Sequence, residues 1–484
     1  MEIRNLEPLP LWNYFADLNA VPRPSKKEEK VIQFIKSFGE KLKLPTYVDE
    51  VGNVIIKKPA SPGMENRQTV VLQSHLDMVH QKNEGTDFDF ATQGIRMYVD
   101  DDWVKAEGTT LGADNGIGVA SIMTILASKD IVHPPIEALF TIDEETGMTG
   151  ALKLKGGLLK GKIMLNLDTE DDQELTIGCA GGVDVTATGV YKEKATPSYS
   201  ASLRISLKGL TGGHSGMEIH LGRGNANKLM NRLLHFATEE FGIQIHSING
   251  GGLRNAIPRE SFAEIAIQKD SIATFETFMA DQQAILKDEY HTTDPGLALE
   301  VTPIPAQPYV LGENFHRLIL RSLYACPNGI YRMSPDIPGL VQSSNNLARV
   351  LVQGGSYTFM CLTRSAVNSE KMDLAEAIRC AFELSGASVK FEGAYPGWTP
   401  DPHSTILTTM RSLYKELYHS DPHVYACHAG LECGILGQNY PQMEMISFGP
   451  NIRGAHSPDE KVQISSVQKY WGFLLETLKR TPLS

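Results

Sequence analysis

Histidines and carboxylates that could bind divalent metals recur from the first quarter of this 484-residue chain to its end. In chain order they are His75, Asp77, Asp114, Glu144, Glu145, Asp168 and His456. Imidazole and carboxylate groups are the donors that zinc and related dications bind in proteins. The set is large enough to hold two ions.

His75 and Asp77 are two residues apart, so their side chains share one face of an extended segment. Asp77 could accept the proton of one imidazole nitrogen and leave the other nitrogen free for a metal. By itself the pair is also explained by a hydrogen-bonded histidine at a polar strand end.

Asp114 precedes Asn-Gly, a turn signal, in a stretch with four glycines between residues 108 and 118. Such a stretch either turns the chain or cradles a phosphate, but no Gly-Lys-Ser/Thr follows, which disfavours a phosphate loop. A carboxylate presented by a turn can bridge two cations.

Glu144 and Glu145 are adjacent and cannot both point the same way from a regular strand. One can bind a metal while the other faces the substrate. A pair of glutamates is often only solvated surface, but this pair follows an apolar run. We therefore favour a role in the site.

A bridging Asp114 would let five side chains serve two ions. One ion would take His75, Asp114 and Asp168, and the other Asp114, Glu145 and His456. Three carboxylates against two dications leave a local charge of about +1, which favours hydroxide, since zinc lowers the pKa of water to about 7. The unligated Glu144 is the natural base for metal-assisted amide hydrolysis.

Four short apolar runs must position these residues: residues 69–73, 136–142, 162–167 and 443–448. They predict buried strands, and the helical spacing of residues 26–42 and 116–128 predicts a βα alternation with a mostly parallel sheet. Ligands collect beyond the carboxyl ends of such strands, where the candidate residues fall.

The middle of the chain has longer amphipathic helices, at residues 225–236, 271–287 and 371–384. We predict an α/β catalytic domain from residues 1–185 and 399–484, with an inserted α+β domain at residues 186–398. Two similar segments begin at residues 252 and 344, each followed by a strand and a helix, which indicates an internal duplication with βαββ halves.

The composition, 42% apolar and 21% charged, is that of a globular protein. A net charge of −12 without a basic block argues against nucleic acid as a partner. Six cysteines without a Cys-x-x-Cys pair, and a start unlike a signal peptide, predict reduced thiols in the cytoplasm. The sequence contains no apolar run of about 18 residues, so we expect no membrane span.

In order and spacing, these motifs resemble the co-catalytic zinc peptidase family of carboxypeptidase G, aminoacylase and the cytosolic dipeptidases. Residues 75–82, 108–116 and 449–460 are similar to its bacterial members that cleave Xaa-His dipeptides. The resemblance implies two divalent ions, with zinc expected and cobalt or manganese suited to the same donors. It implies the metal ligands His75, Asp114, Glu145, Asp168 and His456, with Asp77 supporting His75, Glu144 as the base, and a cis peptide after Asp114.

The resemblance also implies that the inserted domain is a lid. His214, within residues 212–216, would stabilise the oxyanion, and Asn255 would help bind substrate. Arg364 would hold a terminal carboxylate, although an arginine at a strand end is often only a surface residue. His428 and Glu432 either line a specificity pocket or form a buried structural network.

Together these features predict a metallodipeptidase that hydrolyses unblocked dipeptides, with Xaa-His substrates such as carnosine preferred. A hydroxide bridging two metals would attack the peptide carbonyl while Glu144 moves the proton. The alternatives are an N-acyl amino acid deacylase or a tripeptidase of the same family, and a non-catalytic metal-binding scaffold. A homodimer and pairing of a duplicated lid within one chain both stay open.

Overall fold

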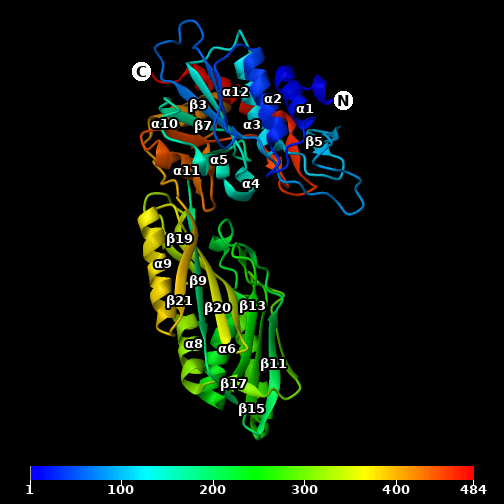
Figure 1. Cartoon of the computed structure of the whole chain (residues 1–484), viewed down its shortest axis with the longest axis vertical. Helices are drawn as coiled ribbons and strands as arrows, with labels where there is room; N and C mark the ends of the chain where they lie inside the picture. Colours follow the sequence, from blue (N-terminus) through cyan, green and yellow to red (C-terminus); the bar gives the residue numbers. More distant parts are fainter. Residues whose placement is uncertain (1) are drawn as a thin grey trace. The chain divides into compact units, whose positions relative to one another are not determined.

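The computed structural model describes residues 2–484 and divides into two compact units (Figure 1). Unit 1 contains the chain up to Gly178, Trp398–Ala426 and Leu431–Ser484. Unit 2 contains Cys179–Gly397 and the short return Cys427–Gly430. The expected boundary at residue 186 falls inside β9 (Gly181–Val190), a continuous strand of unit 2, and the sequence offered no sign of the return at residues 427–430.

An eight-stranded sheet forms the centre of unit 1, in the order β1-β2-β6-β3-β7-β23-β8-β22. The four central strands are mutually parallel: β6 (Ile136–Thr141), β3 (Val70–His75), β7 (Ile163–Asn166) and β23 (Glu444–Ser447). They coincide with the four predicted apolar runs. Strands covered on both faces need no polar alternation, which is why these runs are continuously apolar.

The outer strands of this sheet are β1 (Thr46–Val48), β2 (Val54–Lys58), β8 (Glu174–Cys179) and β22 (His423–Cys427). β2 pairs antiparallel with β6, and β8 pairs antiparallel with β23. A second, four-stranded sheet has the order β24-β25-β5-β4, with β24 (Ile452–Arg453), β25 (Lys461–Gln463), β5 (Trp103–Ala106) and β4 (Met97–Asp100). The mostly parallel sheet is therefore confirmed at its centre, and β1, β2 and β8 pair antiparallel outside it.

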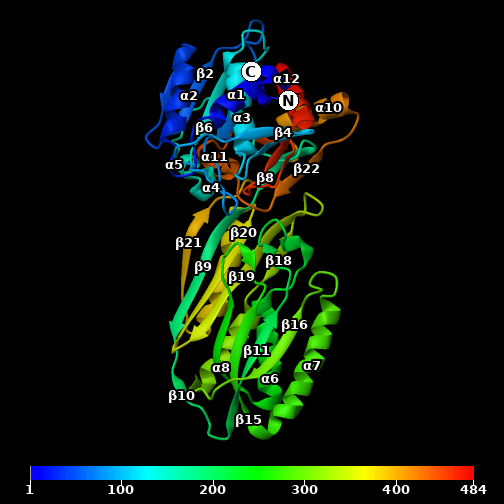
Figure 2. The same cartoon turned by 90° about the vertical axis from the view of Figure 1, so that its right-hand side faces the viewer.

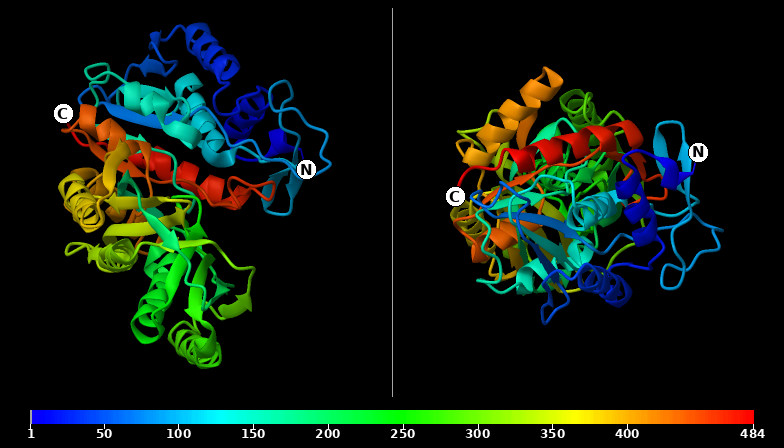
Figure 3. Two further views of the ribbon diagram at one scale, coloured as in Figure 1. Left: turned by 60° about the horizontal axis from the view of Figure 1, so that its bottom comes forward. Right: turned by 90° about the horizontal axis from the view of Figure 1, so that it is seen from above.

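The main helices of unit 1 are α1 (Leu9–Asn19), α2 (Glu29–Lys41), α3 (Ala113–Ala127), α10 (Thr405–Tyr418), α11 (Glu432–Asn439) and α12 (Ile464–Lys479). Both ends of the chain lie in this unit (Figure 3). Gln468 of α12 donates to the Glu7 carbonyl over 3.1 Å. Among residues 2–484, no helix combines the length and apolar character that a membrane crossing requires.

Unit 2 is built on a long antiparallel sheet whose main path is β16-β11-β15-β13-β19-β20-β9-β21 (Figure 2). The first half of this path comprises β11 (Ser200–Lys208), β13 (Gln244–Gly251), β15 (Ser261–Gln268) and β16 (Ala298–Pro303). The second half comprises β9, β19 (Val341–Gln353), β20 (Ser356–Ser365) and β21 (Ser388–Tyr395). Four helices pack on the sheet: α6 (Ala226–Phe241), α7 (Ile272–Glu289), α8 (Glu313–Ala325) and α9 (Asn368–Glu383).

The two halves of the unit 2 sheet have the same topology. In chain order the first half is β11-α6-β13-β15-α7-β16, and the second is β9-α8-β19-β20-α9-β21. Each half lays its strands in the order fourth, first, third, second, and the two second strands, β13 and β19, pair antiparallel in the middle. The predicted duplication is thus present in the topology, as two βαββαβ units rather than βαββ units. It is nested, because the first half lies between β9 and α8.

Candidate functional site

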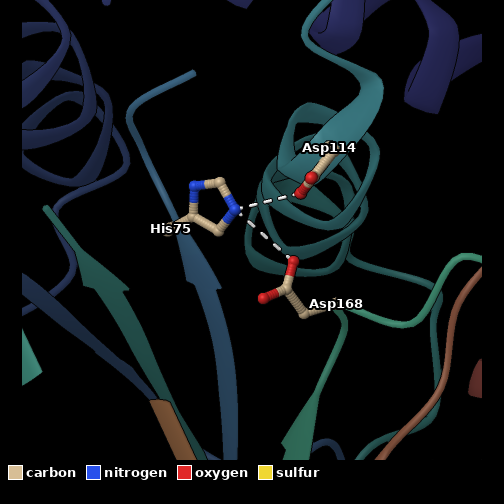
Figure 4. Close-up of side chains that lie close together, drawn as sticks. All are labelled: His75, Asp114 and Asp168. Atoms are coloured by element: carbon tan, nitrogen blue, oxygen red, sulfur yellow. Dashed lines mark hydrogen bonds and ion pairs between the residues drawn. The ribbon is translucent and has the colours of Figure 1, made fainter. Parts of the chain in front are cut away.

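The predicted site residues of unit 1 lie at the carboxyl ends of its parallel strands. His75 ends β3, Asp168 follows β7, and Glu144 and Glu145 open the short helix α4 (Glu144–Gly147) after β6. His75 Nε2 lies 3.0 Å from Asp114 Oδ1 and 3.5 Å from Asp168 Oδ1 (Figure 4). These three side chains can therefore hold one cation.

A second group shares Asp114 with the first. His456 Nε2 lies 3.2 Å from Asp114 Oδ2 and 3.1 Å from Glu145 Oε2. Within each group, all the potential ligand atoms lie within 4.8 Å of one another. Asp114 thus turns one oxygen to each group. We call the set of His75, Asp114, Glu145, Asp168 and His456 the five-residue cluster.

The start of α3 brings Asp114 to this position. A side chain at Gly118 would collide with Ser74 Oγ and the Leu167 carbonyl, so glycine lets α3 lie close against the ends of β3 and β7. Asn115 Nδ2 donates to the Leu167 carbonyl over 2.6 Å and to Asp168 Oδ1. The peptide bond between Asp114 and Asn115 is cis, as expected from the resemblance.

Asp77 connects three parts of the site. His75 Nδ1 lies 3.1 Å from the Asp77 carbonyl oxygen and 3.4 Å from Asp77 Oδ1, so both acceptors favour a proton on Nδ1 and leave Nε2 free. The Asp77 carboxylate also accepts the backbone N–H groups of Glu144 (3.0 Å) and Glu145 (3.2 Å). Asp77 therefore orients both His75 and the glutamate pair. The sequence predicted only its contact with His75.

The five-residue cluster favours positive charge. Hydrogen bonds that His456 donates to the carboxylates of Asp114 and Glu145 raise the pKa of His456 to about 11. Burial acts to lower the pKa of His75, but the carboxylates around it raise that pKa well above its usual range. In addition, Glu145 Oε1 is buried without a hydrogen-bond partner among the described residues. Carboxylates that stabilise cations, a spare buried acceptor and two imidazoles form a donor set that fits two dications.

Glu144 belongs to neither group of ligand atoms. Burial raises the pKa of Glu144 well above its usual range, and the charges of Asp168 and Glu432 act in the same direction. A carboxylate with a raised pKa holds a proton more readily than an ordinary glutamate, which suits a group that transfers protons. Of the two adjacent glutamates, only Glu145 belongs to a candidate ligand group, and the role of Glu144 as the base stays a prediction.

His214 lies in unit 2, in the short strand β12 (Gly213–His214). Its Nδ1 accepts backbone N–H groups from Gly216 (3.2 Å) and Met217 (2.9 Å). These two donors leave the imidazole proton on Nε2. Burial and the nearby Arg364 charge lower the pKa of His214 below its usual value. The ring is therefore neutral near pH 7 and presents Nε2–H as a donor.

Arg364 lies on β20 and is buried, with only 4% of its surface exposed. It donates to Tyr395 Oη over 3.0 Å, while its Nε has no hydrogen-bond partner among the described residues. Gly216 lies close to both the Arg364 guanidinium and the His214 ring, since a Cβ there would contact Arg364 Nε and His214 Cε1, each at 3.1 Å. Arg364 is therefore a buried cation beside His214, unlike an ordinary surface arginine at a strand end.

Asn255 lies in an exposed loop beside His214. β12 pairs with β14 (Ala256–Ile257), so that His214 stands opposite Ala256. The Asn255 carbonyl accepts the Ser215 N–H over 2.8 Å. The structure thus gathers the three residues predicted in the inserted domain, His214, Asn255 and Arg364, within one part of unit 2.

His428 and Glu432 belong to different units although they are four residues apart. In unit 2, His428 Nε2 lies 2.7 Å from Ser344 Oγ, and burial lowers the pKa of His428 to about 3. In unit 1, Glu432 Oε2 accepts from Thr141 Oγ1 (2.6 Å) and Gln73 Nε2 (2.7 Å). Each residue is part of a buried hydrogen-bond network.

The sequence reasoning missed three residues that contact the site. Glu460 accepts four backbone N–H groups from residues 111–114. Arg23 donates to the carbonyls of Leu76, Asp77 and Gly112, and Tyr395 bonds Arg364. Only Glu460 carried a signal, because it closely follows His456; the other two are separated from their partners by long stretches of chain.

Comparison with known proteins identifies the family. The model of peptidase family M20/M25/M40 matches residues 71–480. A cytosol non-specific dipeptidase of Escherichia coli strain K12 is 43% identical over 481 residues, which cover 99% of this chain and 99% of that protein.

Solved structures agree with this match. The aminoacylhistidine dipeptidase of Vibrio alginolyticus has a TM-score of 0.95 and 43% identity, and the match covers 100% of this chain and 99% of that chain. The aminopeptidase PepT of Bacillus cereus has a TM-score of 0.57 at 15% identity, over 98% of both chains, and so shares the fold. The family resemblance read from the motifs is confirmed: the chain belongs to peptidase family M20/M25/M40.

Proposed function

We propose that this protein is a metal-dependent dipeptidase that hydrolyses unblocked dipeptides, with Xaa-His substrates preferred. The observation that carries the proposal is the pair of ligand groups that share Asp114 and have the unligated Glu144 beside them. The names of the two full-length relatives, which are dipeptidases at 43% identity, support the same activity.

In this proposal the five-residue cluster holds two divalent ions, one at His75, Asp114 and Asp168 and the other at Asp114, Glu145 and His456. Bound ions would supply Lewis acidity, which polarises a carbonyl and lowers the pKa of water. The donors suit zinc, cobalt and manganese alike, and zinc is our proposal.

Glu144 takes up the proton that a water molecule releases when its oxygen attacks the peptide carbonyl. It then delivers this proton to the leaving nitrogen. Asp77 supports this role, because it holds the backbone of Glu144 and Glu145 while it orients His75. Glu144 is therefore placed next to a ligand without serving as one.

Residues of unit 2 would bind the substrate during turnover, so that unit 2 acts as a lid. His214 offers Nε2–H to the developing oxyanion, since its Nδ1 is occupied by two backbone donors. Arg364 offers a buried guanidinium with an unused Nε–H to the terminal carboxylate. Asn255 would add a polar contact from the adjoining loop.

Small dipeptides are thus the proposed partners, and the cytoplasm is the proposed location, which the word cytosol in the name of the Escherichia coli relative supports. An N-acyl amino acid deacylase or a tripeptidase would use the same centre with a different requirement at the substrate's amino end. A non-catalytic scaffold would bind metals without turnover.

The test is to load metal-stripped protein with zinc and follow hydrolysis of β-Ala-His, Gly-His and N-acetyl-His, with metal content measured on the same sample. We expect two metals per chain and cleavage of the two dipeptides only. Cleavage of N-acetyl-His would indicate a deacylase. Two bound metals without cleavage of any of the three would contradict the dipeptidase proposal.

A further inference from the structure

Four consecutive backbone N–H groups at the start of α3 converge on one buried carboxylate, that of Glu460. Glu460 Oε2 accepts from Leu111 (2.7 Å) and Gly112 (3.0 Å). Its Oε1 accepts from Ala113 (2.8 Å) and Asp114 (3.3 Å). A carboxylate has two oxygens that each accept two hydrogen bonds, so donors and acceptors match in number.

The same loop is held from its carbonyl side by Arg23. The Arg23 guanidinium donates to the Gly112 carbonyl over 2.5 Å and to the Leu76 and Asp77 carbonyls over 3.1 Å each. Arg23 and Glu460 are 1% and 3% exposed, so water does not compete for these bonds. The loop that carries Asp114 is therefore fixed against the segment that carries His75.

Glu460 also ends the turn that carries His456. The His456 backbone has φ +64°, a left-handed conformation that favours glycine, and its side chain is 56% exposed. Packing therefore contributes little to holding the residue in place. The turn that contains it closes through Ser457 N–H to the Gly454 carbonyl (3.2 Å) and Glu460 N–H to the Ser457 carbonyl (3.0 Å), so the turn ends at the anchored Glu460.

We propose that Glu460 is a positioning residue that sets the bridging ligand Asp114 and the late ligand His456 in one frame. The inference rests on the proposed metal centre and goes beyond it, because Glu460 itself belongs to neither ligand group. Its carboxylate acts through the backbone of residues 111–114 and through the turn at residues 454–460.

The test compares Glu460→Gln with Asp459→Asn in the full-length protein. The substituted glutamine side chain keeps one accepting oxygen and places an NH2 group against two N–H donors, so half of the contacts are lost. Asp459 is exposed, and its backbone N–H donates to Ser457 Oγ over 3.2 Å, so substitution of its side chain is a matched control. Metal-stripped samples are titrated calorimetrically with Zn²⁺, and Co²⁺-loaded samples are examined by visible absorption.

We expect Glu460→Gln to weaken Zn²⁺ binding by about 10- to 100-fold, as loss of an orienting contact does at other metal sites. The Co²⁺ spectrum should change, and kcat should fall while KM stays within about threefold. Glu460→Asp should give an intermediate loss, and Asp459→Asn should match the wild type.

Wild-type Zn²⁺ affinity and Co²⁺ spectrum in Glu460→Gln would overturn the inference, even if its melting temperature were lower. If Glu460→Gln does not fold by circular dichroism, Glu460→Asp carries the test, and wild-type affinity there would overturn it. Fewer than two ions in the wild type would contradict the proposed function itself and the inference with it.

Discussion

Histidines occur at the candidate sites of both units, and the two environments shift their pKa values in opposite directions. In the five-residue cluster of unit 1, hydrogen bonds to carboxylates raise the pKa of His456 to about 11, and the pKa of His75 is also raised. In unit 2, burial lowers the pKa of His428 to about 3, and burial with the Arg364 charge lowers that of His214.

This difference shows that the partners decide what a histidine can do. Carboxylates in unit 1 favour positive charge, which suits metal binding. In unit 2, burial and the neighbouring Arg364 cation lower the pKa of His214, which favours a neutral ring with an N–H to donate. The proposed roles follow this difference: cation binding in unit 1, and hydrogen-bond donation to a substrate in unit 2.

The largest expected effect is the difference between substitutions of the adjacent residues Glu144 and Glu145. Glu144→Gln should retain two metals and lower kcat by about 100- to 10,000-fold, because the base that moves the proton is removed. Glu145→Gln should instead lose metal affinity, since Glu145 Oε2 belongs to the second ligand group. Elemental analysis and steady-state kinetics on both variants test this. Turnover close to wild type in Glu144→Gln would remove Glu144 from the mechanism.

Substitution of His214 tests whether unit 2 donates a hydrogen bond to the developing oxyanion. His214→Ala should lower kcat by about 100- to 1,000-fold with little change in KM, as loss of an oxyanion donor does in other hydrolases. His220, an exposed histidine in the same segment, provides the control His220→Ala. Equal kinetics for the two variants would contradict a donor role for His214.

Substitution of Arg364 tests whether this residue binds the terminal carboxylate of the substrate. Arg364→Lys should raise KM for dipeptides by about 10- to 100-fold, because a lysine cannot form the paired bonds of a guanidinium. The wild type should discriminate against C-terminally amidated dipeptides, and the variant should lose most of that discrimination. If the variant keeps the full preference for the free carboxylate, another residue binds that group.

The smallest effect concerns the neutral histidines of unit 2. Burial lowers the pKa of His316 to about 4, and its Nε2 lies 3.0 Å from Thr238 Oγ1. A histidine with a depressed folded-state pKa stabilises the fold above its unfolded pKa of about 6.5, and that stability is lost as the pH falls towards 4.

We therefore expect His316→Gln to reduce the loss of unfolding free energy between pH 8 and pH 5 by about 1–2 kcal/mol. Urea denaturation at both pH values measures this, with the exposed His291→Gln as the control. Identical pH dependence in the wild type and His316→Gln would show that burial does not keep this ring neutral.

Local pattern predicted much of the fold. The four parallel strands of unit 1 were visible as continuous apolar runs, because strands buried on both faces need no polar residues. The start of unit 2 was harder to place, since unit 2 begins at Cys179 and the strand β9 continues across the expected boundary at residue 186. The nested repeat could not be read from spacing, because β9 and α8 are separated by the whole first half.

By itself, the sequence determined the chemistry available to this protein. Residue types and their order at strand ends predicted the members of the five-residue cluster, since the carboxyl ends of parallel strands meet at one edge of a sheet. Only the tertiary structure decided how those groups are held and charged. Glu460 accepts hydrogen bonds from the Asp114 loop and Arg23 donates to it, and these bonds join residues up to 349 positions apart. Hydrogen bonding, burial and nearby charge set the pKa of each histidine, and they depend on contacts that no local pattern encodes.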